Sequence, residues 1–576
     1  MNSRCFCWVL SFVLLPDILL APSATAQYAG NFQTNIISGV TSNWSGDYLI
    51  GNSNYADILL IQNGGVLSNG FGFIGKGDLS VGSNVVIVSG SGSVWYNNGS
   101  LDAGNPGVNN ELILTNGGTV YSFGGSAGGS SFGPNNAHNN MVLVTGADSI
   151  WSNTGDVMVG GDFSRSNSVT IADGGAVCNS GLFSVGTGQA DRNETVRVTG
   201  NHSVLSTGSL LLGGAGQNSM VVSNGGVVNS SSSMIYGESP DTVLVTGNGS
   251  VWNNGSLVIQ GEQGSALTIC DGGTVFSSAA LIRNPHNSAL VTDTGSVWNV
   301  QSSLEINVTG CSLTVSNGGT AIAGDVQTLG GSYTTLSDGS LYVTNGLGSG
   351  SLQADGAFTF NSGTLATRAT TVNNGSVLTV GDSVDAATFI MVDGGSGFHS
   401  FANGLTISSN AVLKGVGTII GDTAVNPGGK LSSGDAPGSI TFSNNLTLAP
   451  GSIFAVELDG AGGGQYSRLV GLDTLSVSNS ILSVTLGYTP SVGDTFTIIS
   501  NLGPSAVFGT FVDPQGDILA NDAIFTVDEA TFEISYEGNS DVQDVILTAV
   551  IPEPATLLLA ALGSVLLWPA LNRKRT

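Results

Sequence analysis

The stretch VTGNGSVWNNGSLVIQGEQGSALTICDGG, residues 245–273, decides the fold predicted for this chain. It contains two short runs in which apolar and polar residues alternate, one ending at Trp252 and one preceding an Asp-Gly-Gly turn. Alternation with a period of two, bounded by Gly and Asn, is typical of half-buried β-strands. Similar stretches recur along the chain, which indicates a repeat architecture.

Each repeat combines one bulky apolar position with one Asn/Asp-Gly-Gly turn 20 to 23 residues later. The bulky positions are Trp44, Trp95, Trp151, Leu205, Trp252 and Trp298, and the first glycines of the matching turns are Gly64, Gly117, Gly174, Gly225, Gly272 and Gly318. Units of 46 to 56 residues divide into two parts, so we expect two coils per unit. Because one coil cannot bury its own apolar face, the coils should stack into a parallel β-solenoid, an all-β fold.

The recurring tryptophans have two interpretations. A ladder of stacked rings inside the solenoid would bury a large apolar area and fix the register of the coils. An exposed stripe of rings would instead stack on sugars. Leu205 favours the buried ladder, because leucine replaces the bulk of tryptophan but not its flat face.

The Asn/Asp-Gly-Gly triplets are interpreted as sharp turns between strands. Asn and Asp tolerate the left-handed region, and glycine occupies it without steric penalty. Calcium-binding nonapeptides need aspartates at fixed alternating spacing, and that pattern is absent from the sequence. We therefore expect no metal in these turns. Segments that vary in length between repeats, such as residues 124–140, should bulge out as loops.

Composition limits the possible partners. The chain has 576 residues, of which 9% are charged and 86 are glycine, and its net charge is −27. Nucleic acid is not expected as a partner, because neutralising phosphates needs clustered Lys and Arg. No cofactor is expected either, since no phosphate loop or dinucleotide fingerprint occurs.

The sequence offers little to support catalysis. Hydrolysis or elimination of polysaccharides needs paired carboxylates or acids close to basic groups. The four histidines, His138, His202, His286 and His399, stand isolated, without the spacing of metal ligands. Asp191-Arg192-Asn193-Glu194, with Arg197, forms a small charged cluster that we interpret as a solvated turn. The expectation is that the protein is not an enzyme.

Both termini have the features of targeting segments. Residues 1–26 have a short basic start, an apolar stretch and small residues at Ala24 and Ala26 before Gln27, which predicts a secretory signal cleaved there. At the other end, Pro552-Glu553-Pro554 precedes an apolar stretch over 555–571 and the basic tip Arg573-Lys574-Arg575. About 17 residues could form a single transmembrane helix spanning roughly 25 Å.

This three-part tail, residues 551–576, resembles the PEP-CTERM sorting signal of Gram-negative bacteria. The resemblance implies that a membrane-embedded exosortase reads the tail and cleaves it near the motif. It further implies transient anchoring in the inner membrane, followed by release or attachment at the cell surface, often in bacteria that make exopolysaccharide. An unprocessed tail anchor is the alternative.

The ectodomain resembles the repeats that PEP-CTERM proteins share with passenger regions of type V autotransporters. Residues 27–325 are predicted to form the solenoid and residues 326–412 an irregular continuation. Residues 413–550 are similar to the β-rich end of autotransporter passengers, with strands expected at 446–448, 453–458, 482–486, 495–499, 523–527 and 545–550. The sequence departs from that family because no membrane barrel follows.

Three functions are therefore compared. The first is an exported, non-catalytic surface or matrix protein with a structural or adhesive role, whose partners are an exosortase and possible exopolysaccharide or other surface proteins. The second is a carbohydrate-binding surface protein that acts through exposed tryptophans. The third is a β-helical polysaccharide lyase or hydrolase, which the scattered charges disfavour.

Overall fold

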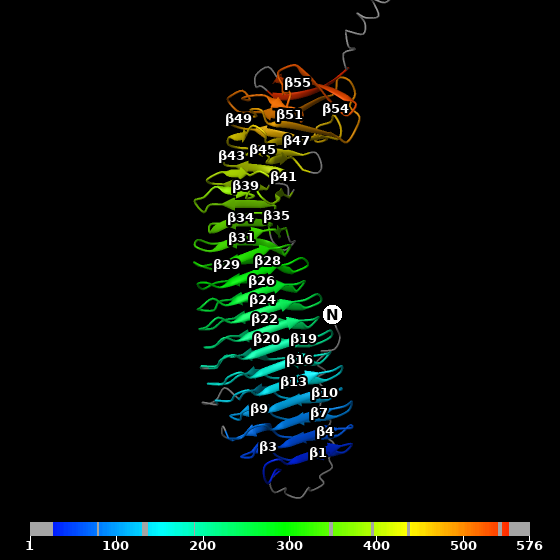
Figure 1. Ribbon diagram of the computed structural model, residues 1–576, viewed down its shortest axis with the longest axis vertical. Helices are drawn as coiled ribbons and strands as arrows, with labels where there is room; N and C mark the ends of the chain where they lie inside the picture. The colour runs from blue at the N-terminus through cyan, green and yellow to red at the C-terminus, as the bar shows by residue number, and fades with distance from the viewer. Residues whose placement is uncertain are drawn as a thin grey trace, which may run out of the picture. The chain divides into compact units, whose positions relative to one another are not determined.

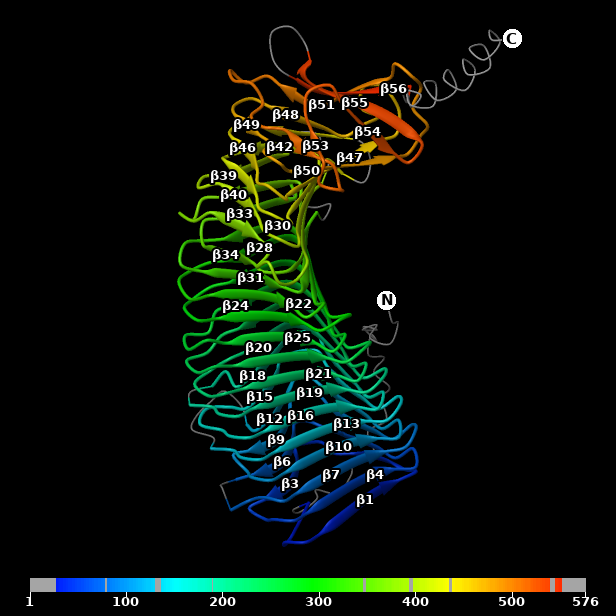
Figure 2. The same ribbon diagram turned by 45° about the horizontal axis from the view of Figure 1, so that its top comes forward.

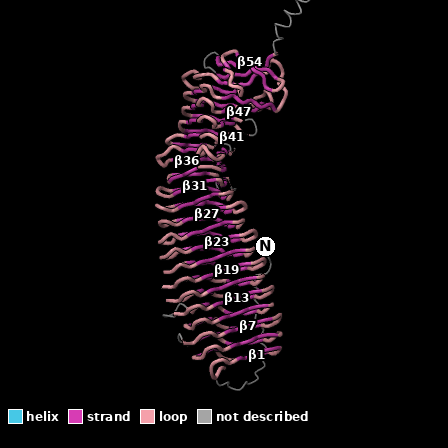
Figure 3. Tube along the Cα trace, viewed as in Figure 1, coloured by secondary structure: helices cyan, strands magenta, loops and turns pink. Residues whose placement is uncertain are grey.

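A computed structural model describes residues 27–551, except for 78–79, 130–135, 189, 345–348, 393–396, 435–437 and 539–543. The described residues form strands and turns and contain no helix (Figure 3). The chain divides into two units, residues 1–374 and 375–576, each with its own stack of strands. The all-β fold predicted from the alternating runs is confirmed.

In the first unit, one sheet takes one strand from every coil, and successive strands pair in parallel (Figure 1). Its strands are β1 (Thr34–Ser38), β4 (Ile58–Gln62), β7 (Val85–Ser89), β10 (Glu111–Thr115), β13 (Met141–Thr145), β16 (Ser168–Ala172), β19 (Thr195–Thr199), β21 (Ser219–Ser223), β23 (Thr242–Thr246), β25 (Ala266–Cys270), β27 (Ser288–Thr292), β29 (Ser312–Ser316), β31 (Tyr333–Ser337) and β34 (Ala357–Phe360). This is the parallel β-solenoid expected from the repeats.

The remaining strands of the early coils come in two short pieces per coil, the second of which is labelled in Figure 2. The first pieces are β2 (Thr41–Asn43), β5 (Val66–Asn69), β8 (Val94–Asn97), β11 (Thr119–Ser122), β14 (Ile150–Asn153) and β17 (Ala176–Asn179). The second pieces are β3 (Tyr48–Asn52), β6 (Gly72–Lys76), β9 (Leu101–Asn105), β12 (Gly125–Ala127), β15 (Val157–Val159) and β18 (Leu182–Val185).

In later coils the two pieces merge into one longer strand, because the corner between them shortens. The merged strands are β20 (Val204–Leu212), β22 (Val227–Ile235), β24 (Val251–Ile259), β26 (Thr274–Ile282), β28 (Val297–Ile306) and β30 (Thr320–Thr328). The unit ends with β32 (Gly339–Val343), β33 (Ser351–Ala354), β35 (Gly363–Thr367) and β36 (Ala369–Val372).

The prediction of two coils per repeat unit is confirmed. Trp95 and Trp151, in successive units, both pair with Val120, which lies on the coil between them. The expected loop over 124–140 is wrong at its start, since residues of β12 pair in parallel with both β9 and β15. Glycine and small residues there continue the ladder, and residues 130–135 lie outside the described part.

The second unit stacks shorter strands in the same parallel manner. Each coil contributes one strand to each of three sets. The first set is β37 (Leu378–Val380), β40 (Leu405–Ile407), β43 (Thr423–Val425), β46 (Leu446–Leu448) and β49 (Leu475–Ser476); the second is β38 (Ala387–Met391), β41 (Ala411–Gly415), β44 (Lys430–Ser432), β47 (Ile453–Leu458) and β50 (Ile481–Leu486); the third is β39 (Phe398–Phe401), β42 (Gly417–Ile420), β45 (Ser439–Phe442), β48 (Arg468–Gly471) and β51 (Thr495–Asn501).

The C-terminal strands of this unit pair differently. They are β52 (Phe511–Val512), β53 (Ile518–Leu519), β54 (Ala523–Val527), β55 (Ala530–Gly538) and β56 (Asp544–Val550). Antiparallel pairs β54–β55, β55–β56 and β51–β56 end the parallel stacking. The six strands expected in this region are present. The boundaries expected after residues 325 and 412 fall inside β30 and β41.

Candidate functional site

The bulky repeat position forms a column inside the first unit. Trp95, Trp151, Trp252 and Trp298 have no exposed surface. Their rings do not lie directly on one another, because alternate coils place a valine in the same column, for example Val275 between Trp252 and Trp298. The expected ladder of stacked rings is therefore corrected to tryptophans on every second coil. Leu205 occupies the column between Val177 and Val228.

Each buried indole N–H donates a hydrogen bond to a polar side chain of the preceding coil. The acceptors are Asn69 Oδ1 for Trp95 at 2.6 Å, Ser122 Oγ for Trp151 at 3.1 Å, Ser230 Oγ for Trp252 at 3.3 Å and Ser277 Oγ for Trp298 at 3.3 Å. A buried N–H without an acceptor would be costly, so these bonds specify the coil on which a tryptophan can sit. A sugar cannot stack on rings that are enclosed in this way.

Trp44 does not belong to this column, contrary to the prediction. The strand register places Ser42 beside Leu67 of the next coil, two residues before Trp44. Trp44 is half-buried at the corner that follows β2, edge-on to Tyr48 with ring centroids 5.7 Å apart. Equal spacing to the next turn was misleading, because strand pairing sets the register and the first coil lacks the Ser-Val-Trp sequence.

The six predicted turns have the backbone conformation that their sequence requires. The first glycines, Gly64, Gly117, Gly174, Gly225, Gly272 and Gly318, have φ between 74° and 90°, and the Asn or Asp before each has φ between 48° and 53°. The second glycine has a different role. A Cβ at Gly118 would overlap the carbonyl oxygen of Val88 on the preceding coil, so close stacking requires glycine there.

A serine two residues before the bulky position ties five of the six turns to the next coil. Ser149 Oγ accepts a hydrogen bond from the N–H of Gly117 at 3.0 Å, and Ser93, Ser203, Ser250 and Ser296 do the same for their turns. All five serines are buried. The bulky position and the turn were singled out from the sequence, but the serine that joins them was missed.

A second column, which we call the polar ladder, was also missed. It consists of the residues immediately before the strands of the one-strand-per-coil sheet: Asp57, Asn84, Asn110, Asn140, Asn167, Glu194, Asn218, Asp241, Ser265 and Asn287. All are at most 1% exposed. The backbone N–H of each member from Asp57 to Ser265 donates to the side chain of the next, at 2.6 to 3.2 Å. The ladder thus links successive coils with directional bonds.

The charged cluster at 191–194, predicted to be a solvated turn, is solvated only in part, since Arg192, Asn193 and Arg197 are exposed. Asp191 and Glu194 are fully buried. Glu194 Oε1 accepts a bond from Ser164 Oγ at 2.9 Å, and Glu194 Oε2 accepts one from the N–H of Asn167 at 2.6 Å. Asp191 Oδ1 accepts from the N–H of Ser164 at 3.0 Å. The two acids are enclosed because they belong to the stacking interface of the coils.

Burial controls the protonation of these acids. It raises the pKa of Glu194 from 4.5 to about 8, against hydrogen bonds from Ser164 and Asn167 that lower it. Burial likewise raises the pKa of Asp241 to about 7 and of Asp191 to about 6. Desolvation penalises the charged form of a carboxyl group, so these acids carry less charge near neutral pH than composition implies.

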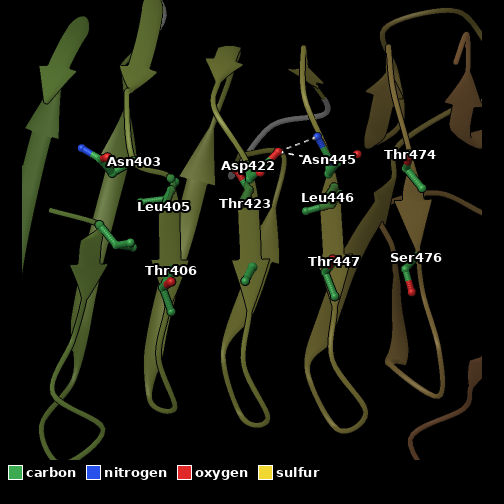
Figure 4. A pocket seen from close by; sticks show the side chains of 13 residues that line it. Asn403, Leu405, Thr406, Asp422, Thr423, Asn445, Leu446, Thr447, Thr474 and Ser476 are labelled. Carbon is green, nitrogen blue, oxygen red and sulfur yellow. Dashed lines mark hydrogen bonds between the residues drawn. The ribbon is translucent and has the colours of Figure 1, made fainter. Parts of the chain in front are cut away.

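The second unit carries a shallow groove of about 440 Å³ on the outer face of β40, β43, β46 and β49 (Figure 4). Thr406, Thr447 and Ser476 present hydroxyl groups along one row, and Asn403, Asp422 and Asn445 form a second row at the strand starts. Asn445 Nδ2 donates to Asp422 Oδ1 at 3.0 Å. The groove offers amide, hydroxyl and carboxylate groups to a polar ligand.

Two further groups bear on metals. His399, one of the four histidines judged isolated, is buried, and burial lowers its pKa to about 4. Cys270, Asp271 and Asp293 hold ligand atoms within 4.8 Å of one another at the turn after β25. Sequence reasoning missed this group because Asp293 lies on the next coil. Asp271 Oδ2 accepts a bond from Thr246 Oγ1 at 3.0 Å, which is ordinary turn chemistry.

The predicted targeting residues lie outside the described part of the chain. These are the signal-cleavage residues Ala24 and Ala26 and the sorting residues Pro552, Glu553, Pro554, Arg573, Lys574 and Arg575. Gln27 is described, and its side chain donates to the carbonyl of Asp47 at 3.0 Å. Within residues 27–551, apart from the gaps given above, no helix has the length and apolar character needed to cross a membrane.

Comparison with known proteins adds little to this picture. No model of a protein family matches the chain, and no curated protein matches it. Among solved structures, a TibC-catalyzed hyper-glycosylated TibA fragment aligns with 81% of this chain and 100% of its own length, at 11% identity and a TM-score of 0.26. A score this low supports no argument, so the assignment of a parallel β-solenoid rests on the strand pairing itself.

Proposed function

We propose that this chain is an exported, non-catalytic protein of the cell surface or extracellular matrix, in which the β-solenoid has a structural or adhesive role. The observation that carries the proposal is that the buried acids are engaged in hydrogen bonds between coils. Asp191, Glu194 and Asp241 accept hydrogen bonds from the backbone of neighbouring coils. Carboxyl groups engaged in this way stabilise stacking and are not free to exchange protons with a substrate.

The groove of the second unit also favours binding over catalysis. Asp422 is the one titratable residue in its lining. Glycoside hydrolysis requires two carboxyl groups on opposite sides of the bond, and lyase chemistry requires an acid close to a base. The lining of this groove therefore lacks the pair of catalytic groups that a polysaccharide lyase or hydrolase, our third hypothesis, would need.

Export and sorting are proposed from the sequence of the termini. The small residues before Gln27 support cleavage of a leader, and Pro552-Glu553-Pro554, the apolar stretch and the basic tip support recognition by an exosortase-type enzyme. The chain would be anchored in the inner membrane until this processing and then reach the cell surface or matrix of a Gram-negative bacterium. Nucleic acid is not proposed as a partner.

Mass spectrometry of both mature termini in the native host tests this proposal, together with cell fractionation. We expect a new N-terminus at Gln27, a C-terminus near Pro552 and recovery in the surface or matrix fraction. Deleting residues 573–575 should trap the chain in the inner membrane. A protein recovered intact from the cytoplasm would contradict export, and turnover of a purified host polysaccharide would contradict the non-catalytic assignment.

Carbohydrate binding is a second candidate, and the groove supports it rather than the tryptophans. Rows of hydroxyl and amide groups at neighbouring strands match the donors and acceptors of a sugar chain. Calorimetric titration with exopolysaccharide from the host tests it. We expect Asn445→Ala to weaken binding about tenfold, which is about 1.4 kcal/mol, and the buried Trp252→Phe to leave it unchanged. Equal binding by Asn445→Ala would exclude the groove.

A further inference from the structure

In the part of the chain that the structure describes, β1, the first strand of the solenoid, has one unpaired edge. The carbonyl of Gln33 accepts from the N–H of Ile58 at 2.8 Å, and the N–H of Gly39 donates to Gln62 at 3.2 Å, so the alternate residues between them bond to β4. Thr34, Ile36 and Ser38 consequently direct their N–H and C=O groups to the other side of β1. Among the described residues, only β4 pairs with β1.

The neighbouring edge of β3 is treated differently by the chain. There the N–H of Leu49, which points away from β6, donates to Gln27 Oε1. Tyr28 is buried beside it and donates to the carbonyl of Ile58 at 3.0 Å. Residues 27–28 therefore cover β3 and the core at this end of the solenoid, but they leave β1 open.

The open edge also lacks the features that usually prevent strand pairing. Natural edges carry charges, prolines or bulges that block a further strand. Residues 27–46 contain no Asp, Glu, Lys, Arg or Pro, although the whole chain has a net charge of −27. Side chains of Phe32, Ile36 and Val40 are 71%, 58% and 57% exposed in this neutral segment.

We propose that β1 pairs in antiparallel fashion with β1 of a second copy of this chain, about a twofold axis at Ile36. In that register Ile36 lies opposite Ile36 of the second copy, and Thr34 lies opposite Ser38 in both directions. All three outward-directed residues then exchange N–H···O bonds, because they occupy the hydrogen-bonded positions of an antiparallel ladder. The contact is isologous and closes on itself as a dimer.

A second copy fits this edge better than an unrelated strand for two reasons. The strand is self-complementary, with a small hydroxyl residue at each end and isoleucine at the centre. The surrounding segment is neutral, so two acidic chains can approach there with the least repulsion. Continuation head to tail is disfavoured because antiparallel pairing of β54, β55 and β56 ends the parallel stack of the second unit. This inference does not depend on the proposed function.

The oligomeric state of the full chain tests the proposal. We expect light scattering after size exclusion to show a dimer. Ile36→Pro and Ile36→Lys should each raise the dissociation constant of this dimer at least about tenfold. Proline is tolerated at 36 because its missing N–H faces the open edge and not β4. Val384→Lys is the matched control, because Val384 is 74% exposed in the second unit. Far-UV circular dichroism checks that each variant is folded.

Cysteine substitutions test the register. Ile36→Cys should form an intermolecular disulfide, because hydrogen-bonded antiparallel partners have Cα atoms about 5.5 Å apart. Ser38→Cys should not, since its partner is Thr34. A monomeric wild-type chain, a dimer unaffected by Ile36→Pro, or cross-linking at 38 instead of 36 would overturn the proposal. Dimerisation only of chains that retain residues 1–26 would overturn it as well, by assigning the contact to that segment.

Discussion

The two units bury different aromatic residues and stabilise their coils by different means. The largest fully buried side chains of the first unit are four tryptophans and Phe183, whereas those of the second are Phe389, Phe401, Phe442, Phe454, Phe496, Phe511 and Phe532. Tryptophan brings an N–H that needs an acceptor, while phenylalanine only packs. The first unit therefore fixes its register by repeated hydrogen bonds, and the second relies more on packing and antiparallel strands.

Deleting a buried aromatic ring should lower the free energy of unfolding of each unit by a similar amount. Trp252→Ala and Phe496→Ala each delete a fully buried aromatic ring and should destabilise their own unit by about 3–5 kcal/mol. Hydrogen exchange resolved by peptide can assign the loss to each unit. We expect Trp252→Ala to expose β24 and its neighbours and Phe496→Ala to expose β51 and β56. Deprotection of both units by either substitution would show that they do not unfold separately.

Removing a polar-ladder side chain should affect the first unit alone. Asn140 Oδ1 accepts bonds from the N–H and the Nδ2 of Asn110, both at 2.9 Å. Asn140→Leu leaves these buried donors without an acceptor and should cost about 2–4 kcal/mol in the free energy of unfolding. The control Asn403→Leu changes an exposed residue of the second unit and should cost less than about 0.5 kcal/mol. Chemical denaturation of the two variants would show a similar loss if the ladder were unimportant.

The two units contain related glycine turns that should tolerate an alanine substitution to different degrees. At either position a Cβ would come too close to backbone carbonyl oxygens, but the overlap is severe at Gly118 and smaller at Gly429, where the closest atoms, the carbonyl oxygens of Ser408 and Ile407, lie at 2.8 and 2.9 Å. Gly118→Ala should therefore cost about 2–3 kcal/mol and Gly429→Ala about 1 kcal/mol. Thermal melts of both variants measure the difference, and the reverse order would contradict the requirement for close stacking at the Asn/Asp-Gly-Gly turns.

The two units should respond to pH in opposite directions. Glu194 has a folded-state pKa of about 8 against 4.5 ordinarily, so the folded state binds more protons between these values. The unfolding free energy of the first unit should fall as pH rises from about 4.5 to 8. His399 has a folded-state pKa of about 4 against 6.5. Because the unfolded state then binds more protons, the second unit should lose stability as pH falls from 6.5 to 4.

Hydrogen exchange measured at pH 5 and at pH 6.5 can separate these trends, once each measurement is corrected for the intrinsic exchange rate at that pH. Glu194→Gln should flatten the response of the first unit, apart from the smaller contributions of Asp191 and Asp241. His399→Gln should flatten that of the second. Parallel trends in both units would indicate that other groups dominate the pH dependence.

The fold was predictable because its signals are local. Alternation within strands and left-handed turn residues can be recognised in a few consecutive positions, as at 266–273. The polar ladder was not recognised because one polar residue before a strand looks like ordinary loop, and its partner lies 22 to 30 residues away. Asp191 and Glu194 were misplaced because charged residues are usually exposed. A search for polar residues at the coil period could have found the ladder.

The smallest expected difference in stability between the two units concerns one serine hydroxyl group in each. The sequence Gly-Ser-Ile-Phe at 451–454 resembles the Ser-Val-Trp pattern, and Ser452 is buried like Ser149. In the first unit Ser149 accepts the N–H of Gly117, whereas in the second the N–H of Gly428 donates to the carbonyl of Gly451 at 2.9 Å. Within the described residues, Ser452 Oγ has no hydrogen-bond partner.

Ser149→Ala should therefore cost about 1–2 kcal/mol, since it leaves the buried N–H of Gly117 without an acceptor. Ser452→Ala removes an unsatisfied hydroxyl and should be neutral or slightly stabilising. Chemical denaturation of the two variants measures the contrast, which isolates hydrogen bonding because both substitutions delete the same atom from a buried site. Equal losses would mean that serine acts in both turns by filling space, and the distinction between a hydrogen-bonded first unit and a packed second unit would then fail at this position.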